Sequence, residues 1–351
     1  MPTDPAHLRT MSQSELVARA RHAGVDNAAG MSAQELVAQL MMREQNAEGE
    51  GVLEILPDGF GFLRAPEFGY APGADDVYVS PSQIRRFNLR TGDTVRGQVR
   101  APKENERYFA LIKVERINGD PADGAREKVL FDHLIPAPPT RAIPGWWTGI
   151  DPTYGSADEL GFGARVFVAG ARGSGRTSIL GKIARNLATL PGVSLFTVFV
   201  AERPEEVPEL RKAFPGEVTA TTFDEADARH VQVLEIVAER VRRQVEARKD
   251  VVLLIDSVTR YARAAHATAP ANGRVVGGVD VAALRSVRKI LASARAIEGG
   301  GSLSIFAVID APDPLADELS GVENARIEVH HDTSMSVRVR PRAGMSAAAP
   351  A

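Results

Sequence analysis

The sequence predicts a multi-domain chain: a small N-terminal helical module, an OB/cold-shock-like β-barrel, and an α/β P-loop domain with a mostly parallel sheet. Three observations predict this. Two capping-box sequences open the chain, five short strands separated by turn residues follow, and a strand, a glycine loop and a helix then begin an alternating region. The expected limits are 1–48, 49–119 and 157–342, with a linker over 120–156 and a disordered tail over 343–351.

The composition is that of a globular chain and excludes several kinds of chemistry. Of 351 residues, 44% are hydrophobic and 25% are charged, and the absence of cysteine excludes disulfides, thiolate metal sites and thiol nucleophiles. A net charge of -3 gives no general attraction to nucleic acid, so any such binding must use local patches. Without a membrane-length apolar run or a signal peptide, we expect a cytoplasmic protein with no membrane partner.

The helical module is predicted from a repeated pattern. Residues 11–18 are echoed by residues 31–38, and each copy carries Ser-x-x-Glu before an apolar stripe, at Ser12 and at Ser32. That pattern is the capping box that begins a helix. A polar hinge is expected over 45–51. A packing unit and a ligand-binding unit are both compatible with this pattern.

The barrel is predicted from short apolar segments bounded by Gly, Pro, Asn and Asp. These segments are 52–56, 59–64, 76–79, 94–99 and 107–114. Five short strands at this spacing are typical of a small Greek-key barrel of the OB or cold-shock type.

Aromatic residues on this barrel indicate an RNA site. Phe60 and Phe62 alternate on one strand, so both rings face the same side, where Tyr78 and Tyr108 can join them with Arg64 nearby. Barrel core is the alternative for each single ring. Other residues already supply core candidates, so a stacking platform for unpaired bases, and hence single-stranded RNA as partner, is favoured.

The P-loop is the best-defined motif of the α/β domain. An apolar strand over 164–169 leads into it and a helix over 178–190 leads out, which is the setting in which backbone N–H groups converge on phosphate. The spacing fits the Walker A pattern at every defined position except one, where Arg176 replaces lysine. The nucleotide-binding candidates are Gly170, Gly173, Ser174, Gly175, Arg176, Thr177 and Ser178.

Two further apolar strands end in acidic residues. The strand over 194–200 is followed by Glu202 and Arg203, and the segment 251–257 holds an apolar strand that ends in the carboxylate of Asp256. A carboxylate at the carboxyl end of a strand beside a phosphate loop is the Walker B placement, which holds Mg²⁺ through water. Between these strands, a helix over 224–248 carries an apolar core stripe.

The chain resembles the bacterial transcription termination factor Rho family. In the barrel, the resemblance covers residues 51–64, 76–93, 102–103 and 106–111. In the P-loop domain it covers Glu202–Val207, Thr222–Glu225, Arg229–Val233, Asp256–Arg260, Gly277–Asp280 and Glu298–Leu303. The long segments of the barrel are highly specific.

The resemblance implies a primary site for pyrimidine-rich RNA and a RecA-like motor that uses ATP and Mg²⁺. The implied RNA-binding residues are Phe60, Phe62, Arg64, Tyr78, Glu106 and Tyr108, with Arg274 in a loop that grips RNA in the central channel of a ring. It further implies Glu202 as the catalytic base, Arg203 against the nucleotide, catalytic roles for Arg176 and Asp256, and Mg²⁺ held by Thr177 and Asp256. The implied partners are the RNA polymerase transcription complex and further Rho-like subunits.

Departures from the family pattern leave two functions open. Arg176 replaces the Walker lysine, Ala201 stands where the family has an acid, the segment before Gly277 is one residue shorter, and the similarity fades after Asp310, so no arginine finger is placed. One hypothesis is an RNA-dependent ATPase that forms a ring and terminates transcription. The other is a catalytically impaired relative that binds RNA and regulates termination, for example by entering rings of an intact Rho.

A few conspicuous residues have simpler interpretations. Trp146 and Trp147 anchor a linker or stack on nucleic acid, and His230 is expected to be structural. The sequence His330-His331-Asp332 is expected to end a strand rather than to bind metal. Arg285, Arg288 and Lys289 form either a solvated helix face or part of a second RNA loop.

Overall fold

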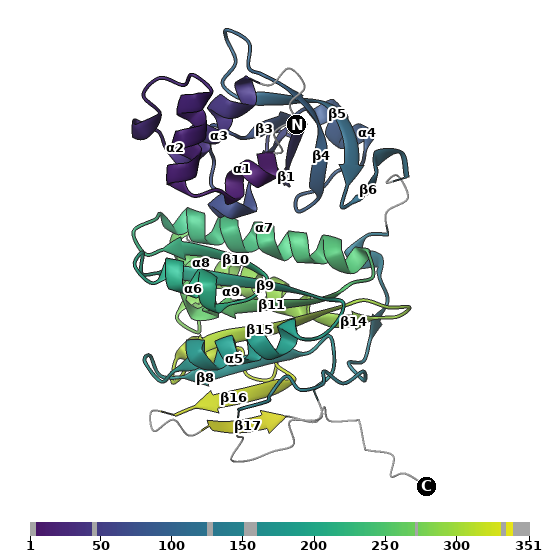
Figure 1. Ribbon diagram of the computed structural model, residues 1–351. Helices are drawn as coiled ribbons and strands as arrows, with labels where there is room; N and C mark the ends of the chain where they lie inside the picture. The colour runs from purple at the N-terminus through teal and green to yellow at the C-terminus, as the bar shows by residue number, and fades with distance from the viewer. Residues whose placement is uncertain are drawn as a thin grey trace. The chain divides into compact units, whose positions relative to one another are not determined.

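The computed structural model describes residues 5–43, 48–124, 129–150, 160–270, 273–330 and 335–339. Two compact units divide them, one reaching Val129 and the other beginning at Leu130 (Figure 1). Several predicted features lie outside the described residues, namely positions 45–47 of the hinge, 151–156 of the linker, His331, Asp332 and the tail over 343–351.

The first unit opens with three helices and a 3-10 turn. These are α1 (Pro5–Thr10), α2 (Gln13–His22), η1 (Ala28–Gly30) and α3 (Ala33–Met42). Both predicted capping boxes form, because the hydroxyls of Ser12 and Ser32 each accept a hydrogen bond from the N3 backbone N–H, and the N3 glutamate accepts one from the backbone N–H of the serine. The repeated pattern therefore begins α2 and α3 at the predicted residues.

A closed six-stranded sheet follows the helices. Its strands are β1 (Glu48–Ile55), β2 (Gly61–Arg64), β3 (Val77–Val79), β4 (Thr94–Arg100), β5 (Phe109–Ile117) and β6 (Asp120–Pro121). Short helices connect or follow them, namely η2 (Pro66–Phe68), α4 (Pro81–Arg86) and η3 (Ala122–Gly124). The strand order is β3-β2-β1-β4-β5-β6, and β3 also pairs with β5, which closes the sheet into a barrel. The five predicted strands and the OB-like barrel are confirmed.

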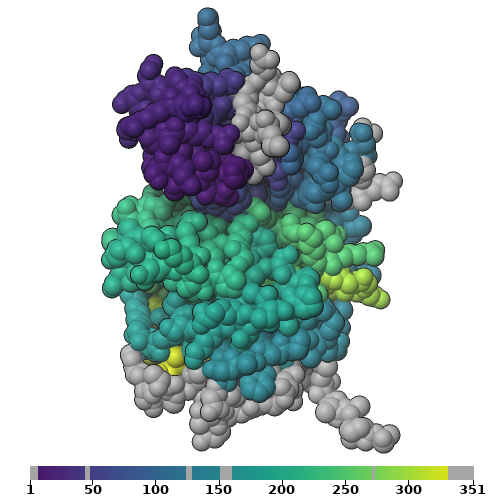
Figure 2. Space-filling model, in the orientation of Figure 1, coloured from purple at the N-terminus to yellow at the C-terminus, as the bar shows by residue number. Residues whose placement is uncertain are grey.

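The three helices and the barrel share one hydrophobic core. Leu16 and Leu36 from the helices belong to the same buried cluster as Leu53, Leu63 and Val77 from the strands. Within this unit, the helices (purple) and the barrel (blue) lie side by side in Figure 2. The helical module therefore packs directly on the barrel.

The second unit is an α/β domain. Its strands are β7 (Pro136–Ala137), β8 (Arg165–Gly170), β9 (Val193–Glu202), β10 (Glu217–Thr222), β11 (Asp250–Asp256), β12 (Val275–Val276), β13 (Val279–Asp280), β14 (Arg295–Ile297), β15 (Ser302–Asp310), β16 (Ala325–Val329) and β17 (Met335–Val339). Its helices are η4 (Phe131–His133), α5 (Arg176–Ala188), α6 (Val207–Ala213), α7 (Asp227–Glu246), α8 (Val258–Thr268), α9 (Val281–Ala292) and α10 (Pro314–Glu318).

The main sheet has the order β10-β9-β11-β15-β8-β16-β17. All neighbours pair in parallel except β16 and β17, which confirms the predicted mostly parallel sheet. The carboxyl ends of β8, β9, β11 and β15 therefore meet at one edge, where ligands bind in open α/β sheets.

Helices cover both faces of this sheet (Figure 1). Val252 and Leu254 of β11 share a buried cluster with Leu180 and Ile183 of α5. The alternate residues of β11 are also fully buried, because α7 and α8 pack on the other face. Trp146 is buried in the α5-side cluster, 5.9 Å from the ring of Phe306, so it anchors its segment to this unit.

Candidate RNA and nucleotide sites

Four aromatic side chains form one cluster on the barrel. Phe60 precedes β2, Phe62 lies within it, and Phe62 pairs across the strands with Tyr78 of β3. The ring centroid of Phe62 lies 5.8 Å from that of Phe60, 6.1 Å from that of Tyr78 and 4.7 Å from that of Tyr108. The structure thus brings together the four residues that the sequence predicts for stacking.

The cluster lies on the outer face of the barrel. Leu63 is fully buried in the barrel core, whereas Phe62 is 8% exposed and does not belong to the core cluster. Because successive side chains of a strand point to opposite faces, Phe62 faces outward and is covered by the other three rings. Phe60, Tyr78 and Tyr108 are half-buried, so these rings supply the accessible surface of the cluster.

Arg64 is buried in ion pairs beneath this cluster. Its Nε donates to Glu54 at 2.7 Å, its guanidinium also pairs with Asp76, and its Cζ lies 4.9 Å from the centroid of Phe62. Burial raises the pKa of Asp76 to about 6, although Arg64 opposes the shift. Arg64 lies two residues after Phe62 on β2 and therefore shares its face of the strand, so the predicted RNA-binding arginine supports the Phe62 ring from that same face.

A cavity of about 590 Å³ lies beside the aromatic rings. Tyr78, Glu106 and Tyr108 line it together with Arg100 and Gln83. Arg100 donates to both carboxylate oxygens of Glu106 and the backbone N–H of Lys103 donates to one, which lowers the pKa of Glu106 to about 2. A carboxylate that is ionised at neutral pH can accept hydrogen bonds in this cavity from an amino group such as that of cytosine.

The phosphate loop connects β8 to α5. Gly173 and Gly175 have φ values of 81° and 92°, which are favourable only for glycine. Gly175 is the N-cap of α5 and makes no side-chain cap bond, so the first N–H groups of the helix remain available to an anion. Ser174 is buried within the loop, and Ser178 lies exposed in the first turn of α5.

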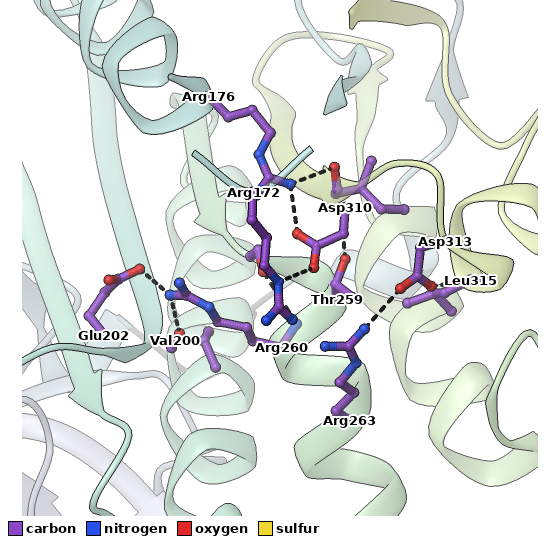
Figure 3. Close-up of polar contacts among 12 residues, drawn as sticks. Arg172, Arg176, Val200, Glu202, Thr259, Arg260, Arg263, Asp310, Asp313 and Leu315 are labelled. Carbon is purple, nitrogen blue, oxygen red and sulfur yellow. Dashed lines mark hydrogen bonds and ion pairs between the residues drawn. The ribbon is translucent and has the colours of Figure 1, made fainter. Parts of the chain in front are cut away.

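Arg176 points to the end of β15. Its Nη1 donates to the carbonyl of Ile309 at 2.9 Å and to Asp310 Oδ1 at 2.7 Å, and Arg172 Nε donates to Asp310 Oδ2 at 3.1 Å (Figure 3). The arginine at the Walker lysine position is therefore paired with a carboxylate of the neighbouring strand.

Thr177 and Asp256 meet at the carboxyl end of β11. Thr177 Oγ1 donates to Asp256 Oδ2 at 2.6 Å. Burial raises the pKa of Asp256, and the hydrogen bond from Thr177 opposes this shift. These oxygens fit Mg²⁺, which favours one or two carboxylate or hydroxyl ligands completed by water and phosphate. No cluster of three or more His, Cys, Asp or Glu that could hold a metal occurs in the described ranges.

Glu202 ends β9, next to β11 in the sheet. Burial raises its pKa, while Arg260 of α8, whose guanidinium pairs with it, opposes the shift. Arg260 Nη1 also donates to the carbonyl of Val200 at 3.1 Å (Figure 3). Arg203 is largely exposed, and its Nη1 lies 3.4 Å from Glu206 Oε1.

The remaining candidates occupy separate places. Arg274 is exposed and precedes the β12–β13 hairpin. Arg288 of α9 pairs with Glu318. His230 Nδ1 lies 2.8 Å from Thr221 Oγ1, and burial lowers its pKa, which fits the expected structural role.

Sequence reasoning missed two polar residues of this edge, Arg260 and Asp310. Asp310 follows an apolar strand, as Asp256 does, so the Walker B signal was present twice. Arg260 lies four residues after Asp256, one turn into α8, and its sequence position alone does not indicate its partner.

Together, these sites define a class: an RNA-binding OB-like barrel followed by a P-loop NTPase domain. Residues 49–123 match the model of the Rho termination factor RNA-binding domain, and residues 159–332 match that of the nucleotide-binding domain of the ATP synthase alpha/beta family. None of the helices in the described residues is both long and apolar enough to span a bilayer.

Curated relatives then identify the family. Transcription termination factor Rho of Chromobacterium violaceum is 42% identical over 94% of this chain and 82% of its own. Rho of Escherichia coli K12 is 42% identical, and the match covers 92% of this chain and 81% of the relative's length. The chain belongs to the transcription termination factor Rho family. A solved ATPase of a type III secretion system covers 49% of this chain and 53% of its own, with 25% identity and a TM-score of 0.45.

Proposed function

We propose that this Rho-family protein binds single-stranded nascent RNA on its barrel and ATP with Mg²⁺ at its P-loop, and hydrolyses ATP when RNA is bound. The observation that carries the proposal is the convergence of Thr177, Asp256 and Glu202 beside a phosphate loop, on a chain that also has an outward aromatic cluster.

RNA is bound by stacking and by one polar pocket. Unpaired bases stack on Phe60, Tyr78 and Tyr108, with Phe62 and Arg64 holding these rings in place. Each stacked base contributes about 1–3 kcal/mol to binding. The carboxylate of Glu106 accepts a hydrogen bond from the exocyclic amine of cytosine, which uracil lacks, so cytidine-rich RNA is preferred over uridine-rich RNA.

The phosphate loop binds the nucleotide, and side chains at the carboxyl ends of β9 and β11 serve its hydrolysis. The N–H groups of Gly173–Thr177 hold phosphate oxygens, Arg176 contacts the terminal phosphates, and Ser178 and Arg203 flank the nucleotide. Thr177 and Asp256 would hold Mg²⁺, which neutralises phosphate charge when bound. Glu202 orients the attacking water and accepts its proton, and its raised pKa suits a base at neutral pH.

In the proposed function, ATP hydrolysis drives translocation of the protein along RNA. We therefore propose that several copies form a ring, that Arg274 faces RNA in its channel, and that the RNA polymerase transcription complex is the target. Since nascent RNA is the ligand, the protein acts in the cytoplasm.

A second function is favoured by one specific observation, the engagement of Arg176 by Asp310. In this alternative, the protein binds RNA and regulates termination without productive hydrolysis, either alone or in mixed rings with an intact Rho. Misplacing one charged donor costs roughly 10²–10³ in turnover, enough to separate the two functions.

ATP turnover, with and without cytidine-rich RNA, distinguishes the two. RNA-stimulated turnover by the unaltered protein supports the ATPase. Absence of turnover that Arg176→Lys restores supports the impaired relative. Absence of turnover in both, with RNA binding intact, also contradicts the ATPase.

RNA binding is tested on the cluster itself. The double variant Phe60→Ala with Tyr108→Ala should weaken binding of oligocytidine by about 10²-fold or more, from two lost stacking contacts. Phe223→Ala, which removes an exposed ring of the second unit, is the matched control and should bind normally. Unchanged affinity in the double variant would refute the RNA site.

A further inference from the structure

The two arginines of the phosphate loop share one carboxylate. Arg176 gives its hydrogen bond to one oxygen of Asp310, and Arg172 gives its own to the other oxygen (Figure 3). A carboxylate that accepts from two guanidinium groups occupies them as a phosphate group does. Asp310 therefore satisfies two cationic side chains of the phosphate loop, one of which, Arg176, is the proposed contact of the terminal phosphates.

The backbone holds Asp310 firmly at the start of the loop. Its Cα pairs with that of Gly170 in the ladder between β15 and β8, and its N–H donates to Thr259 Oγ1 at 2.9 Å. The N–H of the next residue, Ala311, donates to the carbonyl of Gly170. The backbone that carries the carboxylate is thus fixed in the sheet, so we expect the longer arginine side chains to move when they exchange Asp310 for another partner.

The side chain of Arg176 is folded back over the loop. Its Cδ lies 3.5 Å from the position that a Cβ would take on Gly170, and the side chain is 11% exposed. Arg172, in contrast, is 68% exposed. The ion pair with Asp310 is therefore the more protected one at Arg176, where water competes least.

The ion pairs of Asp310 with Arg176 and Arg172 also affect its pKa and the net charge of the loop. Burial raises the pKa of Asp310, but the hydrogen bonds from Arg176 and Arg172 outweigh it and leave the pKa below its usual value. The carboxylate is ionised at neutral pH, so the loop offers one net positive charge from these three groups where two unpaired arginines would offer two.

We propose that Asp310 is a built-in competitor for nucleotide phosphate, which holds Arg176 and Arg172 until the β- and γ-phosphates of a nucleotide displace it. The inference rests on the proposed nucleotide site and adds its regulation. Adenosine, which has no phosphate to trade for the carboxylate, does not compete with Asp310. Asp310 thus sets the affinity of the loop for phosphates. It does not change the contribution of the adenine base to the affinity.

Calorimetric titration of the full chain with MgATP, MgADP and adenosine tests this role. Asp310→Asn keeps the shape of the side chain and removes its charge, so MgATP and MgADP should bind about tenfold more tightly, the value of one charge-assisted hydrogen bond. Adenosine should bind as before. Asp313→Asn is the matched control, because Asp313 lies three residues further on and pairs with Arg263.

A double-mutant cycle separates release of the arginines from a general loss of negative charge. In a chain that carries Arg172→Gln and Arg176→Gln, Asp310→Asn should no longer increase the affinity for MgATP. An equal gain in this background would overturn the proposal. Asp310→Ser serves as the second variant if Asp310→Asn fails to fold, with the same expectation.

The outcomes also separate this inference from the proposed function. Equal binding of MgATP by the unaltered chain and Asp310→Asn refutes the competitor role alone. Binding by Asp310→Asn with no binding by the unaltered chain supports it and contradicts the ATPase. Absence of MgATP binding in every variant refutes both.

Discussion

Arginine and lysine differ in geometry, and this difference matters at position 176. A guanidinium is a planar fork that suits a carboxylate and a backbone carbonyl at once, whereas an ammonium is a compact point charge. Nη1 of Arg176 carries two N–H groups in this plane and donates to both the carbonyl of Ile309 and Asp310 Oδ1. The residue that replaces the Walker lysine therefore has an intramolecular partner well suited to its shape.

Thr177 should control the Mg²⁺ dependence of ATP binding. Thr177→Val removes the hydroxyl that meets Asp256. The factor by which Mg²⁺ increases the affinity for ATP should therefore be about tenfold smaller than in the unaltered chain. Titration of ATP with and without Mg²⁺ measures this difference. Thr189→Val, at the other end of α5, is the control and should keep the full effect. Retention of the full effect in Thr177→Val would show that this hydroxyl does not serve the metal.

Asp76 should make the stability of the barrel depend on pH. Its pKa is raised from 3.8 to about 6, so the folded state binds a proton more tightly than the unfolded state. This contribution is fully present below the unfolded pKa and is lost as pH rises through about 6.

Asp76→Asn mimics the protonated side chain and avoids this loss. We expect Asp76→Asn to match the unaltered chain near pH 4 and to be more stable near pH 7, by about 1–3 kcal/mol. Urea unfolding at several pH values measures the difference. A constant difference across this range would contradict the raised pKa.

Among the elements, β4 depends on one glycine. The register of β4 against β5 shifts at Gly97, and a Cβ there would lie 1.9 Å from the carbonyl oxygen of Lys113. Gly97→Ala should therefore lower the free energy of unfolding by about 1–3 kcal/mol, as overpacking does. Chemical denaturation measures this loss. Gly30→Ala, where the nearest atoms lie at 3.4 Å, is the control and should change stability little.

The elements themselves were largely predictable from sequence. Alternation and capping residues are local signals, so they placed α2, α3, the barrel strands and β11 within a few residues of their observed limits. The partners of Arg64 and Arg176 were not predictable. Asp310 lies 134 residues from Arg176, and only the order of strands in the sheet makes them neighbours. A buried arginine also has the same sequence pattern as one that faces RNA.

At the scale of the whole molecule, the two units have separate hydrophobic cores. We expect two calorimetric transitions on heating, one raised by oligocytidine and the other by MgATP. A ligand at 100 times its Kd adds about 2.7 kcal/mol to the unit that binds it. Phe60→Ala with Tyr108→Ala should abolish the RNA shift and keep the nucleotide shift. A single transition that both ligands raise equally would contradict independent unfolding.

The pairing of β3 with β5 leaves the barrel without an open seam beside the aromatic rings. The surface that we propose for RNA is therefore assembled before RNA arrives, and the protein should lose little conformational entropy on contact. Capture of RNA should then be limited by diffusion and by unstacking of the bases, so sequences that stack poorly on themselves will be captured fastest.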